Sequence, residues 1–169
     1  METMKAILTR RSIRKYKTKE ITKEQVNEII KAAMYAPSAF NKQPWQFLAV
    51  DKKEILDKIF KIIPHAEMLQ QAAAAIIVCG DKNLEENINL IALNCSAATQ
   101  NALLAIHDLG LGAVWVSAYP ADETITGLKK LFNLPENIVP ISVLSIGYPD
   151  EVVPAEERFI PEKIHFNNW

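Results

Sequence analysis

Cysteine is scarce in this sequence of 169 residues, which contains only Cys79 and Cys95, each in apolar surroundings. Two cysteines cannot form the disulfide framework of a small secreted protein, so we interpret both as core residues of a protein that works in a reducing cytoplasm. Histidine is almost as rare. His65, His107 and His165 are far apart and have no cysteine or acid at metal-ligand spacing, so we assign no metal site.

Motifs of catalytic side chains are also missing. Gly110-Leu111-Gly112 follows a predicted helix rather than a strand, and Trp115 stands where a dinucleotide-binding loop has its third glycine, which excludes a Rossmann-type site. No serine or cysteine stands in a nucleophile elbow, and no pair of carboxylates stands out. This absence is expected of an enzyme in which a cofactor carries the reaction while the protein supplies anion binding and polar groups.

Positive charge is concentrated at the start of the chain. Residues 1–19 contain seven Lys and Arg against one acid, a balance of +6, whereas the whole chain has a net charge of −1. A solvated face or a nucleic-acid patch is one interpretation of such a run. The pI near 6.3 argues against nucleic acid as a partner.

Charged residues are absent between Asn87 and His107, over 21 residues, a length that could span a membrane. Polar residues such as Asn94 and Gln100 would lack partners in lipid, and no lysine or arginine closely flanks either end, so we exclude a membrane span. We interpret the stretch as a helix buried on nearly all sides. Because a small domain offers it few neighbours and its small residues permit close packing, we expect it to form the seam of a dimer.

Hydrophobic periodicity predicts alternating helices and strands in a single domain spanning residues 1–169. Thr22 and Gln25 have the spacing of a capping box, and Asp51 with Glu54 is expected to cap the following helix. Helices are predicted over residues 2–9, 23–36, 52–63, 87–107 and 121–132, and strands over residues 46–50, 73–79, 113–118 and 138–146, the last interrupted by Pro140.

A polar loop joins a helix to a strand over residues 37–44. A proline at each end stops the helix and opens the strand, so we expect the loop to be rigid. Ser38, Asn41 and Gln43 place hydroxyl and amide groups within it, which suit hydroxyl-rich or phosphorylated ligands. The charge that such a ligand needs lies upstream, in the arginines of residues 10–14.

Two motifs carry a family resemblance. Arg10-Arg11-Ser12-Ile13-Arg14-Lys15-Tyr16, followed by Pro37-Ser38-Ala39-Phe40-Asn41-Lys42-Gln43-Pro44-Trp45, resembles the paired signature of the nitroreductase family of FMN-dependent oxidoreductases. The likeness continues through residues 94–101, 110–115, 147–149 and 165–169, so it covers essentially the whole chain. It is similar to the short branch of that family.

The resemblance implies an α+β, three-layer fold. A central, mostly antiparallel sheet of four strands would be flanked by helices, with a further C-terminal strand exchanged with the partner subunit. Residues 163–166 could supply that strand by adding to an exposed sheet edge. The resemblance also implies a homodimer with its active sites at the subunit interface.

The family's phosphate-binding positions match Arg10 and Ser12, and Arg14 matches the basic residue at the flavin's pyrimidine edge. A fixed cation there would favour the reduced flavin, on which negative charge develops. Arg11 is included with them; the alternative is that Arg11 is a solvent-exposed neighbour that does not bind the cofactor. Arg158 resembles the family's C-terminal phosphate ligand. The sequence is equally compatible with Arg158 as a surface arginine that binds no ligand.

The family's second flavin-binding segment comes from the other subunit. The matching residues here are Pro37, Ser38, Ala39, Asn41 and, less closely, Gln43. Relatives often have serine in place of Ala39, so this chain lacks the one contact that a serine hydroxyl would make there.

A third segment matches a strand end against the flavin ring, where backbone N–H groups approach it. The residues of this segment are Trp115, Val116, Ser117 and Ala118. A core role is the alternative for Trp115.

The function implied is that of an FMN-dependent oxidoreductase. NAD(P)H would reduce the flavin and leave, and a nitroaromatic, quinone or similar small acceptor would then take its place, in a ping-pong mechanism without a separate catalytic side chain. The alternatives are a flavin-dependent reductase of another specialised substrate and a flavin- or anion-binding protein without turnover. The residues leave the choice between NADH and NADPH open.

Overall fold

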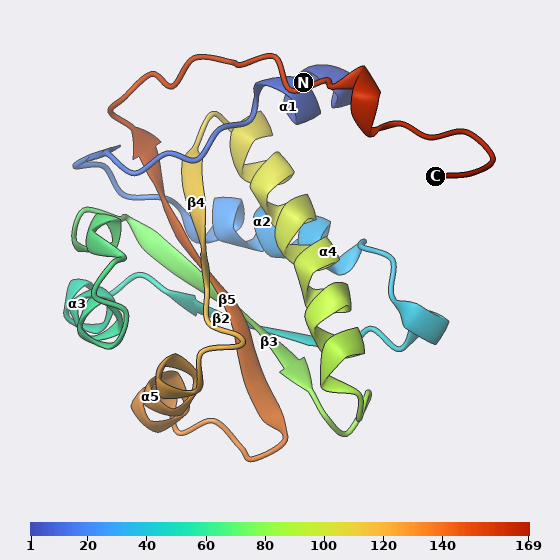
Figure 1. Ribbon diagram of the computed structural model, residues 1–169. Helices are drawn as coiled ribbons and strands as arrows, with labels where there is room; N and C mark the ends of the chain where they lie inside the picture. The colour runs from blue at the N-terminus through green and yellow to red at the C-terminus, as the bar shows by residue number, and fades with distance from the viewer.

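An antiparallel sheet forms the centre of the computed structural model, which describes residues 1–169. Its strands are β1 (Tyr16–Lys17), β2 (Trp45–Val50), β3 (Ala74–Asp81), β4 (Gly112–Ser117) and β5 (Ile138–Pro149). β3 lies between β2 and β5, and the other edge of β5 pairs first with β4 and then, near its end, with β1. The longest strand, β5, therefore lies inside the sheet and has partners along both of its edges (Figure 1).

Helices cover both faces of the sheet. They are α1 (Thr3–Thr9), α2 (Lys23–Met34), α3 (Lys53–Ile62), α4 (Ile88–Asp108) and α5 (Asp122–Phe132), with 3-10 turns η1 (Ala39–Asn41), η2 (Glu67–Gln70) and η3 (Pro161–Lys163). Side chains of β3 alternate between two cores, as the period of a strand requires. Ile76 and Val78 pack toward α2 and α4, whereas Ile77 and Cys79 pack toward α3 and α5. The expected three-layer α+β fold is confirmed (Figure 1).

Within the single chain, α4 is buried on one side and exposed on the other. Residues such as Ile91 and Cys95 are fully covered by the sheet and α2, but Leu93 is 66% exposed, and Asn89 and Gln100 are exposed beside it. The exposed residues recur at helical spacing, so they form one stripe along the outer side of the helix. Within this chain, none of the helices combines the length and the apolar character needed to cross a membrane.

Three local expectations need correction or remain open. α3 begins after Lys52 and has no side-chain cap, so the cap assigned to Asp51 is wrong. Pro140 does not interrupt β5, because a register shift opposite Val78 and Cys79 accommodates the proline, which has no N–H to donate. Residues 161–163 form a 3-10 turn within the chain, and the exchanged C-terminal strand stays a prediction that concerns a second subunit.

The capping box forms as expected at the start of α2. The hydroxyl of Thr22 accepts the N–H of Gln25 at 3.2 Å, and the amide oxygen of Gln25 accepts the N–H of Thr22 at 3.0 Å. We predict that Thr22→Ala lowers the free energy of unfolding by about 1 kcal/mol, measured by urea denaturation at fixed protein concentration. Thr18→Ala, at an exposed site without a side-chain hydrogen bond, is the matched control, and equal effects of the two changes would contradict the cap.

Candidate functional site

The basic run of residues 10–14 lies along one edge of the sheet. Ser12 forms a bridge with Ala113 of β4, and the N–H of Ile13 donates to the Ala113 carbonyl at 2.9 Å. Ile13 is buried, so its neighbour Arg14 points outward and is exposed. The sheet edge thus fixes which side chains of the run can reach a ligand.

Tyr16 anchors the end of this run. Its buried hydroxyl lies 2.8 Å from the carbonyl oxygen of Ile13 and 2.9 Å from that of Ser145, and shares its proton between them. Burial raises the pKa of Tyr16, which keeps the hydroxyl protonated and able to donate. A Cβ at Gly147 would lie 2.8 Å from the Tyr16 ring, so only glycine there lets the run approach the sheet this closely.

Arg10 sits in a region of uncompensated positive charge. Its guanidinium is half-buried; burial lowers its pKa, and the nearby charges of Arg158 and Arg11 lower it further. None of the chain's four arginines forms an ion pair with a carboxylate. Like charges that no ion pair neutralises are unfavourable unless an anion joins them, so Arg10 and Arg158 are candidate anion-binding residues.

Arg11 is engaged by the chain itself. Its Nη1 donates to the carbonyls of Leu8 and Arg10 at 3.0 and 2.7 Å, and its Nε donates to that of Pro154 at 3.1 Å. The remaining nitrogen, Nη2, is buried and has no acceptor in the chain. Arg11 therefore ties the basic run to the C-terminal tail, and one of its buried nitrogens has no partner within the chain.

Two cavities flank the basic run. One of about 190 Å³ is lined by Arg10, Arg11 and His107, and one of about 420 Å³ is lined by Arg14 and His65. Glu151 lines both. Its carboxylate accepts the backbone N–H groups of residues 14 and 15 at 2.6 and 3.1 Å, which fixes the base of the Arg14 side chain.

His107 was not predicted as a site residue. Burial, followed by the charge of Arg10, lowers its pKa, which favours the neutral ring. Thr9 uses its hydroxyl proton on the carbonyl of Lys5 at 2.6 Å, so Nε2 of His107, 2.8 Å away, donates to the Thr9 oxygen. His107, His65 and Glu151 come from separate elements, and no local pattern in the sequence relates them to the arginines.

The loop of residues 38–43 has an unusual backbone. Phe40, Asn41 and Gln43 have φ angles of 53°, 54° and 46°, in the left-handed region. This conformation costs roughly 1–2 kcal/mol for a residue with a side chain, though less for asparagine. Such a loop holds its shape only where surrounding contacts fix it.

Hydrogen bonds within the loop determine which groups face outward. Ser38 Oγ accepts the N–H of Gln43 at 3.0 Å, and Asn41 Oδ1 accepts the side-chain amide of Gln43 at 2.7 Å. Both oxygens are thereby occupied, whereas the Ser38 hydroxyl proton and the Asn41 amide nitrogen stay free to donate. The loop consequently presents donors, which suit the oxygens of a ligand, while Gln43 mainly shapes the loop.

The third predicted segment lies along β4 and just beyond it. Trp115 packs toward α2 and α4, and its buried Nε1 finds no acceptor in the chain. Val116 and Ala118 are buried in the opposite core, and the N–H of Ala118 already donates to the carbonyl of Ile141. Ser117 is exposed. Neither cavity beside the basic run is lined by these four residues.

The structure places the basic run and the polar loop at opposite ends of the sheet. The loop leads into Trp45, which belongs to the row of the sheet that ends at Val139, the second residue of β5. Tyr16, which follows the basic run, pairs with Pro149 at the last residue of β5. About ten residues of extended strand, or roughly 33 Å, separate the two positions (Figure 1). One chain alone therefore cannot bring Arg14 and Asn41 to the same small ligand.

Fold and site together define a three-layer α+β protein with a cluster of arginines at one sheet edge and no catalytic triad or carboxylate pair. The chain belongs to the nitroreductase family, whose sequence profile matches residues 7–148. A Methanothermobacter thermautotrophicus protein, whose name gives NADH dehydrogenase/NAD(P)H nitroreductase as an inferred activity, is 44% identical over 100% of this chain and 88% of that protein. The family resemblance drawn from the two motifs is confirmed.

Solved structures agree with this assignment. The crystal structure of a Parabacteroides distasonis protein with the same inferred activity has a TM-score of 0.94 at 40% identity and covers 99% of this chain and 98% of that one. An FMN-dependent nitroreductase from Clostridium difficile has a TM-score of 0.91 at 31% identity and covers 99% of this chain and 100% of that one.

Proposed function

We propose that this protein is an FMN-dependent NAD(P)H oxidoreductase. The observation that carries the proposal is the half-buried Arg10, which lies near Arg158 and Arg11 without a carboxylate partner. A phosphate monoester fits such a cluster, because planar guanidinium groups bind its oxygens in pairs. No glycine-rich pyrophosphate loop accompanies the cluster, which favours FMN over FAD. The FMN-dependent relative described above supports this choice.

The residues of this chain divide the work of holding the cofactor. Arg10, Ser12 and Arg158 bind the phosphate, and Arg14 lies at the pyrimidine edge, where its charge favours the reduced ring. Glu151 holds the backbone of Arg14 by its N–H group and so limits the positions open to the guanidinium. When bound, FMN accepts a hydride from NAD(P)H and passes electrons to a small acceptor such as a nitroaromatic or a quinone, in ping-pong order.

We propose that the protein is a homodimer with active sites at the interface. Many large apolar side chains are exposed on the single chain, among them Leu8 of α1, Leu93 of α4, Tyr35 and Phe40. Exposed apolar groups in such number mark an interaction surface. Because the polar loop lies far from its own chain's arginines, Ser38, Ala39 and Asn41 are supplied to the flavin of the other subunit.

The cofactor prediction is tested by the absorption spectrum of the purified protein and by mass analysis of the released cofactor. We expect the visible bands of an oxidised flavin, their bleaching by NADH or NADPH, and their return when an acceptor is added. FAD at full occupancy, or no flavin after reconstitution, would contradict the proposal. A protein that binds FMN but does not bleach with either nucleotide would instead be a flavin carrier.

A further inference from the structure

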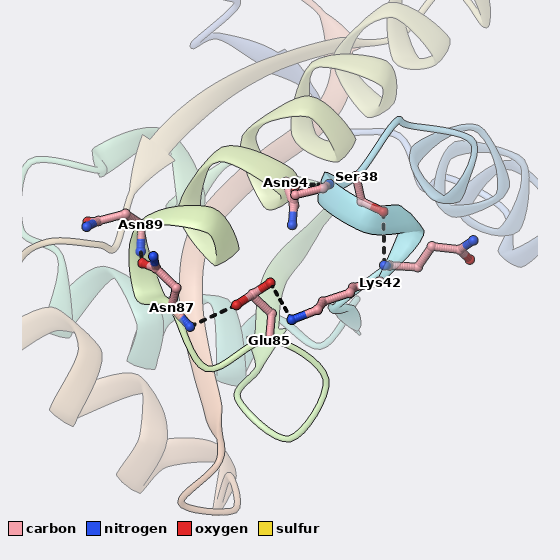
Figure 2. A network of polar contacts seen from close by, with 8 residues as sticks. Ser38, Lys42, Glu85, Asn87, Asn89 and Asn94 are labelled. Carbon is pink, nitrogen blue, oxygen red and sulfur yellow. Dashed lines mark hydrogen bonds and ion pairs between the residues drawn. The ribbon is translucent and has the colours of Figure 1, made fainter.

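Two buried residues outside the predicted site hold the polar loop against the start of α4 (Figure 2). Asn94, which is 5% exposed, accepts the N–H of Ala39 through Oδ1 at 3.0 Å. Glu85, which is 4% exposed, pairs through Oε2 with the Nζ of Lys42 at 2.9 Å. The loop is therefore attached near its beginning and near its end.

The anchoring residue Glu85 is itself fixed by the chain. Its Oε1 accepts the N–H of Asn87 at 3.0 Å, and the Asn87 side chain in turn caps α4 by accepting the N–H of Asn89 at 3.0 Å (Figure 2). The N–H of Asn87 and the ammonium group of Lys42 lower the pKa of Glu85, which keeps its carboxylate charged at neutral pH. The start of α4 thus presents a fixed acceptor to Lys42.

These contacts supply what the loop lacks by itself. Its internal hydrogen bonds, among Ser38, Asn41 and Gln43 and from the N–H of Lys42 to the carbonyl of Ala39, link the loop only to itself, so they fix its local shape but not its position on the protein. The positive φ angles of the loop need further support. Asn94 and Glu85 provide it from the helix whose outer stripe, including Leu93, is proposed to meet the partner.

We infer that Asn94 and the Lys42–Glu85 pair are positioning residues, which hold Ser38 and Asn41 in place to contact the flavin bound by the other subunit. The inference rests on the proposed function. Asn94 and Glu85 act through the loop and make no contact with the cofactor themselves. In this proposal α4 forms part of the dimer interface and also holds the polar loop in place. Dimer formation and completion of the flavin site therefore both depend on α4.

The first test compares Asn94→Leu with Asn101→Leu. Asn101 lies on the same helix and also makes one bond to backbone, from Nδ2 to the carbonyl of Ala32 at 3.2 Å, away from the loop. We expect Asn94→Leu to raise the Kd for FMN about tenfold, as loss of one loop-fixing hydrogen bond implies, and Asn101→Leu to change it by less than about twofold. Fluorescence titration of the FMN-free protein measures both.

A second readout does not involve the flavin. Trypsin cuts after Lys42 only when the loop opens, so we expect cleavage of FMN-free Asn94→Leu protein at this bond to be about tenfold faster than in the wild type and in Asn101→Leu. Lys42→Met, a change at a half-exposed side chain, removes this cleavage site but keeps the FMN titration available if Asn94→Leu does not fold. It should also raise the Kd for FMN, and Lys42→Arg should restore it.

Non-additivity separates positioning from a general loss of stability. If Asn94 acts through Asn41, then Asn94→Leu should weaken FMN binding far less in an Asn41→Ala background than in the wild type. Unchanged Kd in Asn94→Leu and in Lys42→Met, with unchanged cleavage in Asn94→Leu and wild-type protein that binds FMN, would overturn the inference and leave the proposed function standing. Wild-type protein that binds no FMN would overturn both.

Discussion

Arg10→Ala should raise the Kd for FMN by about 10- to 150-fold, since one charge-assisted hydrogen bond contributes roughly 1.5–3 kcal/mol. Arg10 is half-buried beside Arg158 and Arg11, and no carboxylate competes for it. Titration of the FMN-free protein measures the change. Arg158→Ala should raise the Kd in the same way. The wild-type Kd should rise as salt is added, because both arginines bind a doubly negative phosphate and salt screens that attraction.

The same substitution should not destabilise the protein without its cofactor. Removing Arg10 relieves its repulsion with Arg158, so the melting temperature of the FMN-free protein should stay the same or rise. The increase in melting temperature produced by FMN should shrink. Lys58→Ala, an exposed change on α3 at the other face of the sheet, is the control and should leave both values unchanged. An unaltered Kd in Arg10→Ala would remove this arginine from the phosphate site.

The sequence predicts the regular elements well because each rests on a local pattern. Helical spacing of apolar residues indicates α2 to α5, and the capping box at Thr22 starts α2 where expected. The two-residue strand Tyr16–Lys17 escapes prediction, since so short a segment has no period to recognise. Its place depends on pairing with the end of β5.

Long-range contacts that support the site were not predicted, for a related reason. Arg11 donates to the carbonyl of Pro154, and Asn94 accepts from Ala39, across long stretches of chain. No spacing in the sequence relates such partners, because only the folded sheet and α4 bring them together. The charge-free sequence of α4 predicted burial on nearly all sides with the help of a partner; the single chain covers one side, and cover of the other side stays a prediction about a second subunit.

Mixing two inactive variants should restore activity if each active site is shared. Arg14→Ala and Asn41→Ala are both expected to be nearly inactive as homodimers, since Arg14 stabilises the charge on the reduced ring and Asn41 contacts the flavin from the other chain. The expectation rests on the roughly 33 Å between Val139 and Pro149 of β5. The strand that follows the loop begins in the row of Val139, whereas Tyr16, which follows the arginines, pairs with Pro149. Stopped-flow bleaching by NADH measures reduction in each homodimer and in the mixture.

In a heterodimer of these two variants, one site carries both lesions and the other carries none. Random pairing of equal amounts makes half of the dimers mixed, so about a quarter of the wild-type activity should return. A mixture of Arg14→Ala with Ser12→Ala is the matched control, because both lesions belong to the same half of the site and every site keeps one of them. Mass analysis of differently tagged chains establishes that subunits have exchanged. Exchange without recovery in the first mixture would falsify the shared site, because it would mean that Arg14 and Asn41 serve the same flavin from one chain or that only one of them serves it.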